Sequence, residues 1–216
     1  MKRFIFILFA SLIISNNNLS AQEGRMGYKI KTNLGYDFST EGLIQFRSLQ
    51  ENSDRTRALV GEAELNYVRY KYFKPGISVR YSNLRETDIE SVEEVQDKYR
   101  FAADLKIKIP EDIKHFTLQN RLRYQYSMMP EDKVKQLFRN EITASYKPSK
   151  TLKTYVGQET IYRLDKNKLD ALRFEVGIDL KLNGNYGIGG YYIIETLLKN
   201  GLRTHYIAGV EVVYKF

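Results

Sequence analysis

The chain has 216 residues and a formal net charge of +8, and it contains 17 tyrosines, 11 phenylalanines, no tryptophan and no cysteine. The absence of cysteine excludes disulfides, a cysteine-based zinc site and a lipid-modified cysteine anchor. The positive charges are interleaved with negative ones and form no basic run or tail, which argues against nucleic acid as a partner.

The N-terminus has the pattern of a secretory signal peptide. Lys2 and Arg3 are basic, residues 4–14 form an apolar run interrupted only by Ser11, and Ala21 ends a small-residue cleavage site. The run is too short for a membrane-spanning helix, which needs about 20 apolar residues. We therefore expect export through the secretory pathway, with residues 1–21 as the signal peptide and residues 22–216 as one domain.

The rest of the chain is a succession of segments in which apolar and polar residues alternate. Leu65 and Tyr67, for example, share one face of their segment, whereas Glu62 and Glu64 share the other. A period of two indicates strands and not helices. The expected strands, in chain order, are 27–38, 41–49, 58–70, 76–84, 98–109, 115–128, 136–147, 152–164, 169–182, 186–197 and 203–216.

The lengths of the strands and of their connections predict an all-β, antiparallel transmembrane β-barrel in the bacterial outer membrane, surrounded by its lipid. Most segments are longer than the strands of globular domains and match the roughly 9–11 residues that a tilted strand needs to cross a bilayer. Short turns alternate with connections that are in several cases longer and more charged, as in outer-membrane barrels. The short turns are expected at 72–75, 110–113, 148–150 and 183–185, and the other connections at 51–57, 85–97, 129–135, 165–168 and 199–202.

The number of strands is the first open point. Eleven segments are an odd number, whereas single-chain bacterial barrels usually have an even one. A break near Thr32-Asn33 in the first segment would give about 12 strands, and a first segment that pairs only in part would give 10. We expect 12, with 10 as the alternative, and leave the oligomeric state open.

The two faces of the strands have different expected environments. Tyrosines and phenylalanines near the strand ends, such as Tyr28, Tyr99 and Phe116, are expected to form girdles at the lipid headgroups. The polar faces are expected to line a lumen with a network of charges: Arg47, Glu62, Glu64, Arg80, Arg100, Asp104, Arg121, Arg123, Arg139, Glu141, Glu159, Arg173, Glu175 and Glu211. Such a network either fills a narrow barrel in a structural role or lines a narrow pore that selects small polar solutes.

Catalysis has little support in the residues. His115 and His205 are the only histidines, and neither has an obvious nucleophile or acidic partner for an outer-membrane hydrolase. Two isolated histidines without cysteine predict no metal site, and no motif predicts a cofactor. A secreted, lipocalin-like binder remains an alternative, because alternation is the same in soluble and membrane barrels.

Short stretches of the chain resemble a known family. Asn120 to Gln125 (NRLRYQ), Gln158 to Arg163 (QETIYR) and the terminal Tyr214-Lys215-Phe216 are similar to the Bacteroidetes-type outer-membrane barrels called domain of unknown function 2490. The resemblance covers essentially the whole of residues 22–216 and implies an outer-membrane barrel of no known activity. The positions that match the polar pattern of the family are Arg47, Arg80, Arg100, Arg121, Arg123, Arg139, Glu159 and Arg173.

The C-terminal strand also resembles an assembly signal. Tyr214 and Phe216 resemble the terminal aromatic pair of the assembly signal of outer-membrane proteins, although Gly209 lies farther from the end than is usual. We therefore expect the barrel assembly machinery as a partner.

Overall fold

The computed structural model describes residues 22–51, 54–87, 93–109, 115–129, 133–182, 184–198 and 202–216, so the expected signal peptide lies outside the described residues. Among the described residues, no helix is long and apolar enough to cross a membrane. The elements are eleven strands and one short 3₁₀ helix: β1 (Glu23–Asn33), β2 (Phe38–Glu51), β3 (Asp54–Tyr67), β4 (Phe73–Thr87), β5 (Glu93–Ile109), β6 (Phe116–Met128), β7 (Val134–Tyr146), β8 (Leu152–Arg163), η1 (Leu164–Lys166), β9 (Lys168–Lys181), β10 (Tyr186–Leu197) and β11 (Arg203–Lys215).

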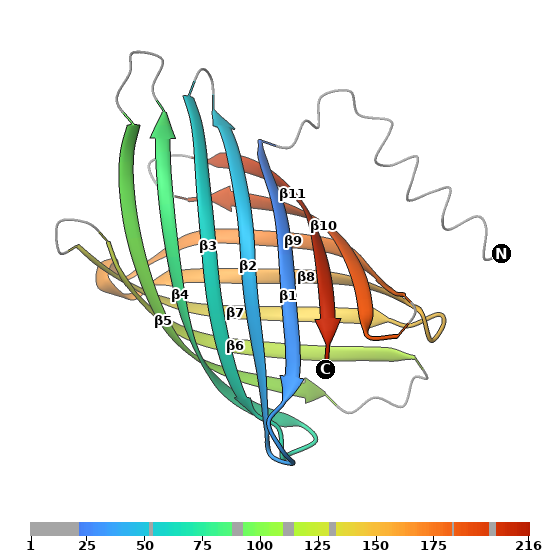
Figure 1. The fold of residues 1–216 in the computed structure, drawn as a ribbon. Coiled ribbons are helices and arrows are strands. Elements are labelled where there is room, and N and C mark those ends of the chain that lie inside the picture. The colour runs from blue at the N-terminus through green and yellow to red at the C-terminus, as the bar shows by residue number, and fades with distance from the viewer. Residues whose placement is uncertain are drawn as a thin grey trace.

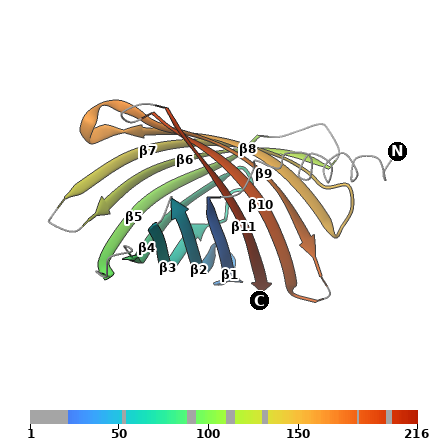
Figure 2. The same cartoon turned by 90° about the horizontal axis from the view of Figure 1, so that it is seen from above.

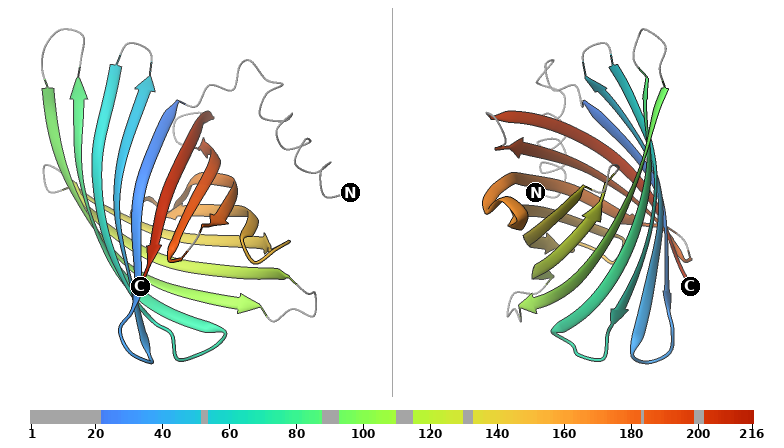
Figure 3. Two further views of the ribbon diagram at one scale, coloured as in Figure 1. Left: turned by 45° about the vertical axis from the view of Figure 1, so that its right-hand side comes forward. Right: turned by 90° about the vertical axis from the view of Figure 1, so that its left-hand side faces the viewer.

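The strands form one closed barrel, as the alternation predicted. Each strand pairs antiparallel with the next, and β11 pairs with β1 to close the ring. Figure 1 shows β1 and β11 side by side, and Figure 2 shows the same closing strands from above. In Figure 3 the strands of opposite walls cross at a steep angle, as tilted strands of a barrel do.

The strand number differs from the expected 12 and from the alternative of 10. The barrel has eleven strands, because β1 continues without a break through Thr32 and Asn33, which pair with Thr40 and Ser39 of β2. After an odd number of strands, the first and the last run in the same direction. The barrel therefore closes with a parallel pair, from Glu23 opposite Ile207 to Lys31 opposite Lys215.

The ladders extend beyond several of the expected strand ends. The pairing of β4 with β5 runs from Thr87 opposite Glu93 to Phe73 opposite Ile107, well into the charged segment that was expected to be a loop. The pairing of β2 with β3 likewise continues to Glu51 opposite Asp54, which makes that connection much shorter than the expected one. Backbone hydrogen bonds need no alternation of side chains, so a ladder can continue where the polarity pattern stops.

The exterior of the barrel is apolar. Met26 is 70% exposed, and Ile44 and Ile77 are each 62% exposed, all on outward faces. At the end where β11 finishes, the rings of Tyr186 and Tyr214 lie 4.7 Å apart. Phe38, Tyr146 and Phe216 are further exposed aromatic residues at this end. An apolar outside and a charged inside are the reverse of a soluble lipocalin-like barrel and suit a lipid surrounding.

Two glycines inside the barrel are required by close approach of an aromatic ring. Gly177 lies directly opposite Tyr155 on the neighbouring strand, and Gly209 lies directly opposite Tyr191. A Cβ atom at either glycine would overlap the tyrosine ring, so any other residue would displace that ring. The two glycines thus allow both tyrosines to lie flat against the inner wall.

Candidate functional site

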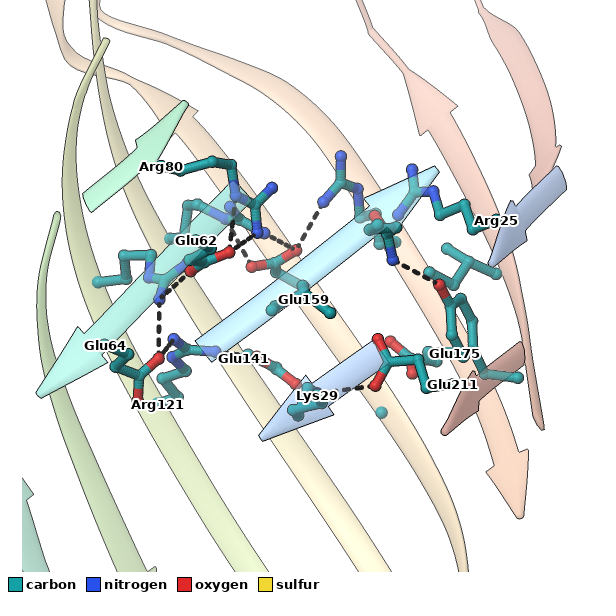
Figure 4. Close-up of a pocket in the computed structure, with 18 of the residues that line it drawn as sticks. Arg25, Lys29, Glu62, Glu64, Arg80, Arg121, Glu141, Glu159, Glu175 and Glu211 are labelled. Carbon is teal, nitrogen blue, oxygen red and sulfur yellow. Dashed lines mark hydrogen bonds and ion pairs between the residues drawn. The ribbon is translucent and has the colours of Figure 1, made fainter. Parts of the chain in front are cut away.

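The lumen is the candidate site, and it is built by the inward-facing residues of alternating strands. A cavity of about 370 Å³ lies within it, lined by ten lysines and arginines and seven glutamates. Thirteen of the fourteen residues expected in the luminal network line this cavity, and Asp104 lies behind it with its side chain fully buried. Figure 4 shows Arg25 and Arg80 on the upper side of the cavity and Glu141, Glu175 and Glu211 on its lower side.

The most buried ion pairs are centred on Asp104 of β5. Its carboxylate accepts hydrogen bonds from Arg121 Nε at 2.7 Å and from Arg123 Nε and Nη2 at 2.7 and 2.9 Å. Glu64 extends the group by pairing with Lys106 and with Arg121. Three cationic side chains from β5 and β6 therefore hold two carboxylates, which leaves this group with one positive charge in excess.

A second group of ion pairs lies on the strands that follow in the ring, β7 to β10. Arg139 of β7 donates from Nε and Nη2 to the two oxygens of Glu159, at 2.7 and 2.8 Å. Arg173 of β9 bridges Glu159, at 3.4 Å, and Glu195 of β10, at 2.7 Å. Forked contacts of this kind are stronger and more directional than single hydrogen bonds, so they fix the guanidinium groups in place.

The lower side of the cavity has few cations. Lys29 pairs with Glu211 at 2.7 Å, whereas Glu175 accepts a hydrogen bond at 2.9 Å from the hydroxyl of Tyr155. Glu141 lies 4.0 Å from Arg121 and accepts a hydrogen bond from Thr143. Among the described residues, Glu175 therefore has no cation within ion-pair distance, and Glu141 has only the more distant Arg121.

Two arginines lack such partners. In the part of the chain that the structure describes, neither Arg47 nor Arg100 has a carboxylate within ion-pair distance. Arg47 donates only to the neutral side chain of Gln45, at 2.7 Å, and the Nε of Arg100 is buried without a hydrogen-bond partner. Both side chains line the cavity.

A smaller cavity of about 140 Å³ shares part of the same lining. Arg100, Arg139 and Arg173 contribute to both cavities, so these three arginines separate one space from the other. The smaller cavity is otherwise bounded by Asp170 and Lys135, which pair at 2.7 Å, and by a small apolar cluster that contains Leu137, Ile161 and Ala171.

Several lining residues were not among the expected ones. Arg25 lies before the expected start of the first strand at residue 27, whereas β1 begins at Glu23. Tyr155 lies in phase with the expected luminal residue Glu159, and Tyr191 lies in phase with Glu195, so this phase was the signal that could have found the two tyrosines. Lys29 lies on the first strand, for which no luminal residue was expected. Tyrosine was instead assigned only to the girdles.

The histidines do not form a catalytic arrangement in the described residues. His115 lies in a turn with a positive φ of 73°, and its carbonyl accepts the backbone N–H of Lys147. His205 lies opposite Glu195, whose carboxylate already binds Arg173. No group of three or more histidine, cysteine, aspartate or glutamate residues that could hold a metal ion occurs in the described ranges.

Comparisons with known proteins agree with this architecture. The pattern of the family described as "Protein of unknown function (DUF2490)" matches residues 26–203, and the chain belongs to this family. A search of curated protein sequences finds no match.

Solved structures with a similar fold are outer-membrane barrels. The beta domain of the Bordetella autotransporter BrkA is 7% identical, with a TM-score of 0.55 and 79% of each chain covered. The translocator domain of the autotransporter NalP from Neisseria meningitidis is 11% identical, with a TM-score of 0.55, 85% of this chain and 77% of that chain covered. The KdgM porin in complex with disordered oligogalacturonate is 15% identical at a TM-score of 0.48, over 91% of this chain and 99% of that chain. The apolar exterior and this shared fold locate the protein in the bacterial outer membrane, with lipid around the barrel.

Proposed function

We propose that the protein is a narrow channel that lets small polar solutes cross the outer membrane. The observation that carries the proposal is the charged cavity of about 370 Å³ inside the barrel, which shares three lining arginines with the second cavity. A polar cavity of this size holds water, whereas an empty cavity is apolar. Water inside a barrel is the first requirement of a channel.

The arginines between the two cavities are the proposed constriction. Arg100, Arg139 and Arg173 come from three strands and project into one level of the lumen. Rings of charged side chains set the selectivity of pores, because a passing ion exchanges part of its hydration shell for them. The ion pairs of Arg139 and Arg173 keep two of the three side chains fixed, so the constriction has a defined width.

The proposal includes how the protein reaches the membrane. Residues 1–21 would direct export as a signal peptide, and the barrel assembly machinery would recognise Tyr214 and Phe216. The exposed ring of Phe216, which packs edge-on against Tyr214 at 4.6 Å, is available for such recognition.

The test is conductance of the purified full chain in planar bilayers. Because the chain has no cysteine, Gly157→Cys places a single thiol in the lumen, and Val156→Cys places one on the lipid-facing side of the same strand. A charged thiol reagent is expected to block the current of the Gly157 variant and to leave that of the Val156 variant unchanged. A barrel that shows its folded mobility on gels but passes no current would refute the channel.

A second candidate function is a filled barrel with a structural role. The observation that favours it is the density of luminal ion pairs, among them the pairs of Asp104 and Glu159, each of which is shared by two arginines. A filled lumen predicts no current in the bilayer experiment and no effect of a thiol reagent. The same measurement therefore distinguishes the two functions, and neither requires an enzymatic activity.

A further inference from the structure

The lumen places arginines directly opposite one another on neighbouring strands. The strand registers pair Arg25 with Arg47, Arg80 with Arg100, and Arg123 with Arg139. Side chains directly opposite in an antiparallel pair lie with Cβ atoms about 4.5–5.5 Å apart, and like charges there are destabilising. Three such pairs in one lumen therefore need compensation.

Most of these arginines have a carboxylate that compensates them. Arg25 binds Glu23, Arg80 binds Glu62, Arg123 binds Asp104, and Arg139 binds Glu159. Within the described ranges, this leaves one arginine of the first pair and one of the second, Arg47 and Arg100, without a counter-charge.

Both arginines keep donors that no described protein group uses. Arg47 uses only its Nε, toward Gln45, which in turn donates to the hydroxyl of Tyr191 at 3.2 Å. Arg100 makes no hydrogen bond from its buried Nε. A buried donor without a partner costs about 1–3 kcal/mol, so its place in a lumen that is otherwise well paired calls for a ligand.

We propose that Arg47 and Arg100 form a binding site for a small solute that carries one oxyanion group, a carboxylate or a phosphate. The proposal rests on the channel function above, because the solute must enter the lumen, and it names the class of solute. Guanidinium groups present paired N–H donors whose geometry matches the two oxygens of a carboxylate or phosphate. The cavity volume of about 370 Å³ lies in the range of small-molecule sites.

The acidic lower side of the cavity limits the ligand to one oxyanion group. Glu141, Glu175 and Glu211 face the same space as the two arginines, as Figure 4 shows for the three glutamates. A second negative group on the ligand would meet these carboxylates, whereas hydroxyl groups could donate hydrogen bonds to them. The affinity need only be modest, because a solute that passes through a channel must also leave its site.

The experiment measures binding to the full chain in detergent by isothermal titration calorimetry. Sodium phosphate and sodium gluconate are titrated at constant ionic strength, with chloride as the balancing anion. Saturable binding of phosphate alone, or of gluconate alone, identifies which oxyanion the site takes. Saturable binding of neither at millimolar concentration overturns the proposal.

Variants test the two arginines. Arg47→Gln and Arg100→Gln are each expected to weaken binding by about tenfold or more, which is the size of one lost charged hydrogen bond. Arg100→Lys keeps the charge but not the fork, and it should bind with intermediate affinity. Lys153→Gln is the control, since Lys153 pairs with Asp179 at 3.0 Å and does not line the cavity. The affinity of this variant for the anion should equal that of the wild type. Unchanged affinity in both glutamine variants, with folded mobility on gels, refutes the site.

The binding and conductance results can be separated. A barrel that binds the oxyanion but passes no current supports the site and refutes the channel. A barrel that passes current, binds neither anion and shows no change in Arg100→Gln supports the channel and refutes the site.

Discussion

Replacing an arginine by glutamine is expected to change barrel stability in opposite directions at two luminal positions, Arg123 and Arg100. Arg123 is 6% exposed and donates from two nitrogens to Asp104, whose side chain has no exposed surface. Breaking a buried ion pair costs about 3–5 kcal/mol, because the remaining charge is left without its partner. We expect a loss of about 3 kcal/mol for Arg123→Gln, at the lower end of this range, because Arg121 still binds Asp104 at 2.7 Å.

Arg100→Gln is expected to stabilise the barrel by about 1 kcal/mol. The substitution removes a positive charge that lies directly opposite Arg80, and such like-charged pairs cost roughly 0.2–1 kcal/mol. It also removes a buried Nε that has no hydrogen-bond partner in the described structure. The lost packing of the longer arginine stem offsets part of this gain.

The assay is equilibrium unfolding in urea of the chain inserted in lipid vesicles. The protein has no tryptophan, so tyrosine fluorescence and the gel mobility of the folded fraction would follow the transition. Opposite shifts of the midpoint in the two variants support the assignment of paired and unpaired arginines. Equal destabilisation by both substitutions would refute it, since an arginine that lacks a counter-charge cannot cost as much to remove as one that holds Asp104.

Three further predictions concern other parts of the barrel. Gly177→Ala is expected to destabilise the fold by about 1–3 kcal/mol in the same urea assay, because the added Cβ overlaps a tyrosine ring. Gly61→Ala is the control and should have little effect, since no atom lies within 4 Å of a Cβ added there. Phe216→Ala should slow insertion in an assembly assay with the purified barrel assembly machinery, whereas Phe46→Ala, another exposed phenylalanine, should not; equal rates would contradict the assembly-signal hypothesis. Asp165 lies in η1, outside the membrane-spanning strands. Burial acts to raise its pKa, but hydrogen bonds from the backbone of β7 and from a neighbouring arginine outweigh this effect. They hold the pKa of Asp165 below its ordinary value of 3.8. The ionised Asp165 carboxylate therefore stabilises the fold above pH 3.8, and this contribution is lost as the pH falls through the lower pKa of the folded state. Proteolysis near η1 should accordingly increase in acid. Asp165→Asn should remove that pH dependence.

The sequence predicted the local structure of this barrel well, because alternation is a property of single strands. Each of the eleven expected strands is present, and charged residues such as Glu62, Arg121 and Glu159 face inward as their phase indicated. The ends of the strands were less predictable, because the ladder of β4 with β5 continues through charged residues that carry no alternation. Backbone pairing, and not side-chain polarity, determines where a strand ends.

The pairing of charges could not be predicted, because it depends on register. The sequence shows that Arg80 and Arg100 both face the lumen, but only the register of β4 with β5 shows that they are direct neighbours. Likewise, no described carboxylate lies within ion-pair distance of Arg47, and this depends on the register and on side chains from several strands. The odd strand number could not be predicted for a related reason. An even number is usual in single-chain bacterial barrels, whereas the pair of strands that closes this barrel depends on the whole ring.

The registers of β1 with its two neighbours determine which of its charged residues find a partner. A parallel ladder is slightly weaker per residue than an antiparallel one, so the seam between β1 and β11 needs another source of specificity. A slip of β1 by one residue would turn Arg25 and Lys29 toward lipid, at a cost of about 2–4 kcal/mol for each charge at the bilayer midplane. The alternation of charge on β1 therefore fixes the register of the seam. The register of β1 with β11 places the ammonium of Lys29 2.7 Å from the carboxylate of Glu211. The register of β1 with β2 places Arg25 opposite Arg47, and Glu23 compensates only the charge of Arg25. The unpaired guanidinium of Arg47 is thus a consequence of the register of β1 with β2.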